Sequence, residues 1–205
     1  MTGMQVVDSK RNPFIARTLA AVVLAAASSG CVEMPIRNYT VHLGQRALDA
    51  DGWEPVSDQL TLGVETDTYR PADGWGMEMG ALYSRDEGTR AIDGLSSVEA
   101  KGATWELYLG ARKTLKTSVG KAHPYLGGGL TWIWSDFEAS SGDQTLSGSD
   151  DSPALYLHCG VIWRVGASLN VGLDLRVVTG ASADMFGIDG DADYAQVALG
   201  VGFQF

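Results

Sequence analysis

The last eleven residues, Ala195-Gln-Val-Ala-Leu-Gly-Val-Gly-Phe-Gln-Phe205, alternate strictly between apolar residues and small or polar ones. In a β-strand, successive side chains point to opposite faces, so residues two apart share a face. The apolar residues at 197, 199, 201, 203 and 205 would therefore lie together, opposite glycine, alanine and glutamine. This stretch predicts a strand with one apolar face and one small or polar face.

Seven earlier stretches repeat this alternation, so the sequence predicts eight strands. They lie near residues 38–44, 60–65, 75–84, 105–112, 124–134, 155–164 and 168–177. The connections at 45–57, 85–103, 136–153 and 179–194 are long, and those at 70–74, 113–122 and 165–168 are short. This arrangement is typical of an outer-membrane barrel with both termini in the periplasm. We therefore predict an all-β fold, an eight-stranded antiparallel up-and-down transmembrane β-barrel.

A soluble lipocalin-like barrel would have the same strands with the apolar face turned inward. Two features favour lipid outside. Glycines on the non-apolar face fit the crowded lumen of a small barrel. Aromatic residues of the apolar face gather at the two strand ends, with Trp75 and Trp163 near the short turns and Tyr83 and Trp105 near the long loops. From Trp75 to Tyr83 is about 26 Å of strand, which after tilting approaches the height of a membrane's apolar band.

The non-apolar face also carries acidic and basic residues together. An eight-stranded barrel is just wide enough inside for side chains, and buried charges must be paired. We therefore expect ion pairs that fill the lumen, with an ion path as the alternative. The predicted network comprises Glu65, Asp67, Glu78, Glu106, Arg112, Arg164, Asp174 and Arg176.

The first thirty residues have the features of a secretory signal peptide: basic residues at 10, 11 and 17, an apolar run over 19–27 and small residues after it. The apolar run is about half the length that a transmembrane helix needs. Cys31 then occupies the position of a lipidated cysteine, and the alternative is ordinary cleavage near 27–31 with no role for Cys31. The predicted organisation is a signal peptide at 1–30, a short periplasmic segment at 31–37 and a barrel at 38–205.

Composition excludes some classes of protein. The 205 residues include 15 basic and 25 acidic ones, for a formal net charge of −10. A nucleic-acid partner is excluded because the phosphate backbone requires a cationic face. Two cysteines, Cys31 and Cys159, are too few for an all-cysteine zinc site. We expect no cofactor.

The terminal Phe205 follows apolar residues at every second position, and two further motifs are His123-Pro-Tyr-Leu-Gly-Gly-Gly129 and Gly172-Leu-Asp-Leu-Arg176. In these features the chain resembles small bacterial outer-membrane barrels of the OmpA/OmpX type, over roughly residues 38–205. The resemblance implies a bacterial outer-membrane location and contact with outer-membrane lipid. It also implies insertion by the barrel-assembly machinery, which would recognise the C-terminal strand with Phe205 as its signal.

Polar residues offer two further candidate sites. Barrels that resemble the lipid A deacylases carry a His-x-Ser-Asn element, which none of His42, His123 and His158 matches. Asp189-Gly-Asp-Ala-Asp193 has alternating carboxylates, as calcium-binding loops do, so Asp189, Asp191 and Asp193 are metal candidates. The alternative is an ordinary solvated acidic loop.

We predict a non-enzymatic outer-membrane barrel with extracellular acidic loops and an envelope-structural or surface-interaction role. The alternatives are a lipid-modifying hydrolase of the outer membrane and a narrow channel. The sequence does not identify an extracellular ligand.

Overall fold

The computed structural model describes residues 35–48, 53–90, 97–115, 121–141, 144–185 and 188–205. The barrel lies within a compact unit, Met34–Phe205. The signal peptide and Cys31 lie outside the described residues, so both stay predictions. Within the described residues, no helix is long and apolar enough to cross a membrane.

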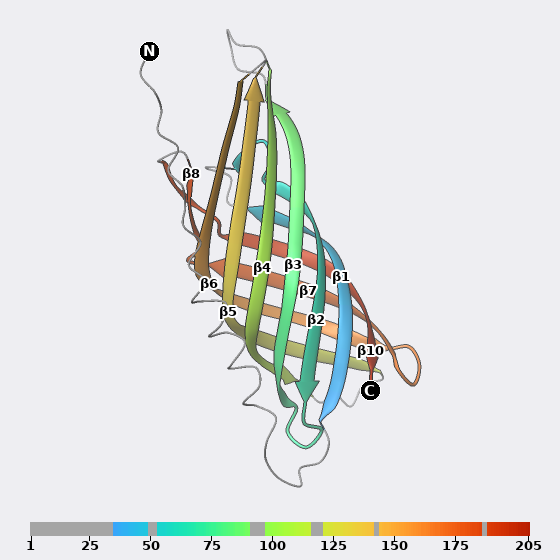
Figure 1. Ribbon diagram of the computed structural model, residues 1–205. Helices are drawn as coiled ribbons and strands as arrows, with labels where there is room; N and C mark the ends of the chain where they lie inside the picture. Colours follow the sequence, from blue (N-terminus) through green and yellow to red (C-terminus); the bar gives the residue numbers. More distant parts are fainter. Residues whose placement is uncertain (1–34, 49–52, 91–96, 116–120, 142–143, 186–187) are drawn as a thin grey trace. The chain divides into compact units, whose positions relative to one another are not determined.

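Eight strands form a closed antiparallel barrel in the order β1-β10-β7-β6-β5-β4-β3-β2 (Figure 1), which confirms the predicted fold. Its strands are β1 (Ile36–Leu48), β2 (Asp58–Tyr69), β3 (Trp75–Arg90), β4 (Val98–Thr114), β5 (Ala122–Ser141), β6 (Gln144–Arg164), β7 (Leu169–Thr179) and β10 (Tyr194–Gln204). A separate hairpin, β8 (Ser182–Met185) and β9 (Ile188–Asp191), lies in the connection between β7 and β10.

The first and last strands close the barrel. Asn38 lies opposite Gln204 in the register of β1 and β10. The backbone of Phe205 donates to the carbonyl of Arg37 at 2.9 Å and accepts from its amide at 3.2 Å. The N-terminal end of the barrel and the C-terminus of the chain therefore lie side by side, at the end that carries the short turns.

Along each strand, apolar residues alternate with small or polar ones, and exposed side chains alternate with buried ones in the same order. On the outward face, Leu130 and Leu199 are 66% and 63% exposed, whereas the inward Arg46 and Gln59 are fully buried. An apolar outside around a polar inside is the reverse of a soluble barrel. It is the arrangement that a lipid environment stabilises.

The predicted long loops at 85–103 and 136–153 are wrong: most of these residues continue the strands. β3 runs to Arg90 and β4 begins at Val98, while β5 runs to Ser141 and β6 begins at Gln144. We call residues 86–90, 98–103, 136–141 and 144–152 of these four strands the extension; Figure 1 shows β3 to β6 rising past the other strands. The outward face of the extension carries serine and charged residues instead of apolar ones. In the extension the strands stay paired, but their outward residues are no longer apolar, so the alternation that predicts a strand is lost.

Inward glycines leave room for tyrosine rings of the neighbouring strand. A Cβ added at Gly80 would lie 2.4 Å from the hydroxyl of Tyr108, and one at Gly160 would lie 2.5 Å from the hydroxyl of Tyr125. Either contact is far below van der Waals distance, so an alanine would displace the tyrosine. The inward glycines thus make room for the side chains of their cross-strand partners, Tyr108 opposite Gly80 and Tyr125 opposite Gly160.

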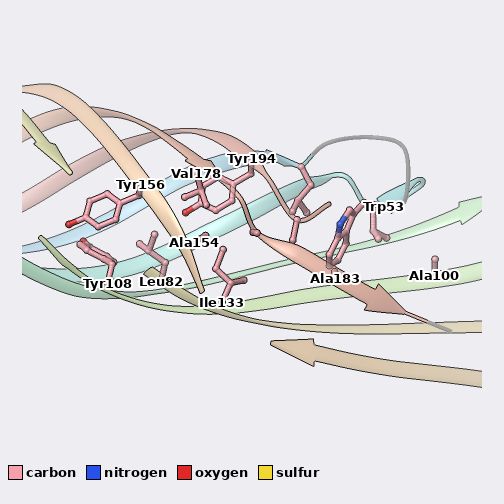
Figure 2. Packing of buried hydrophobic residues seen from close by; sticks show 14 residues of the cluster. Trp53, Leu82, Ala100, Tyr108, Ile133, Ala154, Tyr156, Val178, Ala183 and Tyr194 are labelled. Carbon is pink, nitrogen blue, oxygen red and sulfur yellow. The ribbon is translucent and has the colours of Figure 1, made fainter. Parts of the chain in front are cut away.

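The buried apolar cluster lies toward the long-connection end of the barrel (Figure 2). Trp53 and Val56 come from the β1–β2 connection and Ala183 from β8, and they pack with inward residues of the wall such as Ala100. Trp53 donates its indole N–H to the carbonyl of Asp191 at 3.0 Å. The connections therefore fold over the lumen as an apolar cap.

Candidate functional site

The inward polar residues form two charged clusters. In the cluster nearer the short turns, the Arg112 guanidinium contacts three carboxylates. Its nitrogens lie 2.6 Å from Glu65, 2.9 Å from Asp67 and 2.7 Å from Glu78. All four side chains are buried, so these charge-assisted contacts are shielded from water. We call these four residues the Arg112 cluster.

His158 connects the Arg112 cluster to the opposite wall. Its Nε2 lies 2.8 Å from Glu78 and its Nδ1 lies 2.9 Å from Asp174. Tyr125 donates its hydroxyl to the same Asp174 carboxylate at 2.6 Å. The Nδ1 contact is a hydrogen bond, and the Nε2 contact is within ion-pair distance. His158 thus links carboxylates on two sides of the lumen.

The second cluster centres on Glu106, nearer the cap. Arg46 and Arg176 donate to its two carboxylate oxygens at 2.8 and 2.6 Å. Thr131 donates at 2.8 Å, and the hydroxyl of Tyr194 also donates to Glu106. The two arginines and Glu106 are buried, so one carboxylate is compensated by two cations.

Aromatic rings fill the space around the charged groups. The Arg176 guanidinium lies 4.0 Å from the ring centroids of both Tyr108 and Tyr156. Arg46 lies 3.7 Å from the ring of Tyr194. Such cation–π contacts stabilise a cation that has left water. Rings and guanidinium groups together occupy the cross-section of the lumen.

A layer of hydrogen-bonded side chains separates the Glu106 cluster from the cap. Ser84 donates to Gln59 at 2.7 Å and lies 2.6 Å from the hydroxyl of Thr104, and Arg46 donates to Thr104 at 2.8 Å. Trp53 and Val56 lie beyond this layer, with a Cβ at Gly102 within 3.4 Å of both. Among the described residues, the lumen therefore passes from charged to polar to apolar packing.

A small cavity lies inside the barrel. It measures about 20 Å³ and is lined by His42, Glu65, Arg112 and Asp174 among others. This volume suits about one water molecule. The Nε2 atom of His42 faces Glu65 at 3.9 Å, too far for a direct hydrogen bond.

Metal binding is disfavoured in the lumen. Ligand atoms of Glu65, Glu78 and His158 lie within 4.8 Å of one another, a spacing that suits a metal ion. However, the Arg112 guanidinium already contacts both carboxylates. A metal cation there would have to displace a buried arginine or lie beside it, against charge repulsion.

The structure brings together seven of the eight residues predicted for the lumen network. Glu65, Asp67, Glu78 and Arg112 form one cluster, Glu106 and Arg176 belong to the other, and Asp174 pairs with His158. Arg164 joins neither cluster in the described part of the chain; it donates to the hydroxyl of Tyr69.

Sequence reasoning missed Arg46. The predicted first strand ended at Gly44, which left Arg46 in a loop, but β1 runs to Leu48. The signal was present, because Arg46 continues the inward series of His42 and Gly44. The strongly buried Trp53 was missed for a different reason: it lies in a connection without strand periodicity.

The other predicted sites lie apart from the lumen. Asp191 is exposed, and the Asp193 carboxylate accepts from Thr179 at 3.0 Å and from the amide of Ala181 at 2.9 Å. The side chain of Asp189 lies outside the described residues, so the metal candidates stay a prediction. Phe205 is 79% exposed at the barrel's edge, where its ring packs against Tyr39.

Comparison with known proteins identifies the architecture. The family model "Outer membrane protein beta-barrel domain" matches residues 18–205. No match was found among curated protein sequences. Among solved structures, the attachment invasion locus protein Ail of Yersinia pestis is similar, with a TM-score of 0.56 at 12% identity over 84% of this chain and 100% of that chain.

Two other solved structures agree with this result. A major outer membrane protein of Thermus thermophilus gives a TM-score of 0.56 at 10% identity, covering 84% of this chain and 100% of that one. Neisserial surface protein A gives a TM-score of 0.50 at 13% identity, covering 83% and 97%. At these identities the similarity concerns the fold.

Proposed function

This chain belongs to the outer membrane protein β-barrel family and resides in a bacterial outer membrane, and from that premise we propose that it is a closed, non-enzymatic barrel that acts through its surface extension. The barrel anchors the chain in the membrane, and the extension presents a polar sheet to partners outside the cell.

The observation that carries this proposal is the filled lumen. The Arg112 cluster, the Glu106 cluster, the hydrogen-bonded layer and the cap follow one another along the barrel axis. An ion moving through this series would have to separate buried ion pairs. Leaving one charge of such a pair buried without its partner costs several kcal/mol. The packing therefore supports an anchor over the alternative of a channel.

The extension supports the surface role. The pairing of β2 with β3 ends at Leu60 and Arg85, and that of β6 with β7 begins at Leu155 and Thr179. Four strands continue beyond these points and pair only with one another in the main ladder. This paired polar sheet offers more surface to a partner than a short turn would. Ail, a structural neighbour, is named for attachment and invasion.

The alternative of a lipid-modifying enzyme receives less support. His158 is buried in the lumen between two carboxylates, and His42 is buried as well. An acyl chain in the outer leaflet lies outside the barrel wall and cannot reach either ring. His123 is less buried but lies at the short-turn end, away from the outer leaflet in this orientation.

Conductance tests the closed lumen. The purified protein in a planar bilayer should give no regular single-channel steps. The double variant Glu106→Ala/Arg176→Ala removes one plug cluster and serves as the comparison, since it opens space beneath the cap. Discrete conductance by the unmodified protein would contradict the closed barrel.

Shortening the extension tests the surface role. Deleting residues 89–99 and 140–145 trims both hairpin tips while keeping the wall around Trp53. We expect outer-membrane vesicles with the intact protein to bind a subset of an immobilised panel of peptides, glycans and proteins, and the trimmed variant to lose that binding. Equal binding by both forms, each verified as folded by its gel mobility without boiling, would contradict the role.

A further inference from the structure

A hollow of about 450 Å³ lies on the outward face of the extension. Its lining includes Tyr83 and Arg85 of β3, Lys101 of β4, Asp136 and Glu138 of β5 and Ser149 of β6. The positions named alternate with buried ones such as Ser84 and Ser135, so most of the lining faces away from the lumen. We call it the girdle hollow because it lies beside a row of outward aromatic residues toward the long-connection end of the barrel.

The register locates the girdle hollow at the membrane boundary. Tyr83, Trp105 and Trp134 lie side by side across β3, β4 and β5, and they form the last aromatic row of the apolar outer face. The next outward row consists of Arg85, Ala103 and Asp136. Aromatic rows mark the interface between hydrocarbon and water on outer-membrane barrels. The girdle hollow thus lies next to the aromatic row, of which Tyr83 belongs to its lining, and its other side is charged.

Small residues form the floor and charged residues stand above it. Ala103, Gly102 and the Ser147-Gly148-Ser149 stretch belong to the lining and leave the space open. Arg85 is paired with Glu87, which is also in the lining, so this cation is already compensated. Lys101 lies opposite Glu87 and Glu138 in the strand register, and the whole lining has two cations against four carboxylates.

We propose that the girdle hollow binds the lysine or arginine side chains of a basic amphipathic helix that lies in the membrane surface. This inference rests on the proposed surface role and names the class of partner. A helix of this kind buries its apolar face at the level of the headgroups and keeps its cations in water. The aromatic row would contact the apolar face, and the carboxylates would contact the cations.

The spacing of the carboxylates suits a helix. Asp136 and Glu138 are two residues apart on one strand face, about 6.7 Å along the strand. Helix residues one turn apart have Cβ atoms about 5–6 Å apart. Two basic residues at positions i and i+4 would therefore each meet one carboxylate. The Tyr83 ring, packed 4.5 Å from Trp105, offers a π face to a cation as well.

Lys101 distinguishes this partner from an anionic one. A phosphate-bearing headgroup would use Lys101 as its main contact, so removing that charge would weaken binding. A basic helix would be repelled by Lys101, so removing the same charge would strengthen binding. The sign of the change with Lys101→Gln therefore decides between the two chemistries.

The experiment uses the full barrel in phosphatidylcholine nanodiscs and a labelled 18-residue helical peptide of leucine and lysine, with lysines at i and i+4. Affinity is measured by fluorescence anisotropy against empty nanodiscs. We expect Asp136→Asn/Glu138→Gln to weaken binding about tenfold, because two ion pairs are lost together. The matched pair Asp58→Asn/Glu99→Gln removes the same charge from exposed sites outside the lining and should change affinity less than about twofold.

Lys101→Gln should tighten binding severalfold, and a peptide with glutamate in place of lysine should not bind. Equal losses in the two acidic pairs, weaker binding by Lys101→Gln, or no binding above empty nanodiscs would each overturn the inference. This experiment can fail without contradicting the proposed function. If the barrel does not bind the peptide, yet is closed in bilayers and loses surface binding when the extension is shortened, only the inference of a basic-helix partner is wrong.

Discussion

Replacing Arg112 with methionine should destabilise the barrel more than any other single change in the lumen. Methionine keeps most of the length of the side chain but removes the cation that three buried carboxylates share. Removing one partner of a buried ion pair typically costs about 3–5 kcal/mol, because a charge is left without compensation. Here three carboxylates lose a shared cation, so we expect about 5 kcal/mol, the upper end of that range.

Arg112→Lys separates the charge from its geometry. A lysine has the same positive charge in a compact ammonium group. It lacks the planar guanidinium, whose nitrogens reach three carboxylates in different directions. We expect a loss of about 2 kcal/mol, in the range for a charged hydrogen bond. This variant also keeps the experiment informative if Arg112→Met does not fold.

The neighbouring residue gives a matched control. Lys113 points to the outside of the same strand, where its ammonium lies 4.9 Å from the ring of Trp75. Lys113→Met therefore removes one positive charge at the next position without touching the lumen. Its cost should stay below about 1 kcal/mol, as for exposed charge pairs.

The assay is urea unfolding in detergent micelles, followed by tryptophan fluorescence, with gel mobility without boiling as a check of folding. A double-mutant cycle with Glu78→Gln adds a second measure. Removing one carboxylate relieves part of the repulsion, so the double variant should be more stable than the sum of the single losses by about 1–3 kcal/mol. If Arg112→Met costs no more than Lys113→Met, the reasoning about the plug is refuted.

Three other perturbations test the orientation and assembly of the barrel. Leu173→Arg should lower the free energy of folding into lipid vesicles by about 2–4 kcal/mol, because it places a charge on the lipid face. Asp174→Asn should leave insertion intact and act through the contact with His158. Equal insertion by both variants would contradict the assigned faces. Deleting Phe205 should lower the amount assembled in the outer membrane while total synthesis persists, as immunoblots of membrane fractions would show; an unchanged membrane yield would count against a C-terminal signal. Protease added to intact cells should cut within 91–96 but not within the short turn 70–74, and the opposite pattern of fragments would invert the topology.

The strands and their faces were predictable because the information is local. Each strand contains its own alternation, so Leu173 and Asp174 can be assigned to opposite faces without knowledge of any other strand. The same locality explains where prediction failed. In the extension both faces meet water or polar neighbours, so Ser147 and Ser149 give no apolar alternation although they lie in β6.

The partners within the lumen required the register of the whole barrel. The alternation predicts which residues face the lumen. The ion pairs of Arg112 with Glu65, Asp67 and Glu78 also depend on the tilt of the strands and on the register of three of them. The cap was harder still. Trp53 lies in a connection, and its hydrogen bond to Asp191 joins residues separated by most of the chain.

The closing pair of β1 and β10 constrains how this protein can be made. Asn38 and Gln204 are 204 − 38 = 166 residues apart, so the barrel has no closed form until the last residues of the chain have been delivered. Before then, both outer strands would expose rows of unpaired amide and carbonyl groups, which hydrocarbon does not tolerate. A partly formed barrel in the bilayer would therefore be costly unless these edges are paired or shielded. Closure depends on the pairing of the two strands that lie farthest apart in the chain.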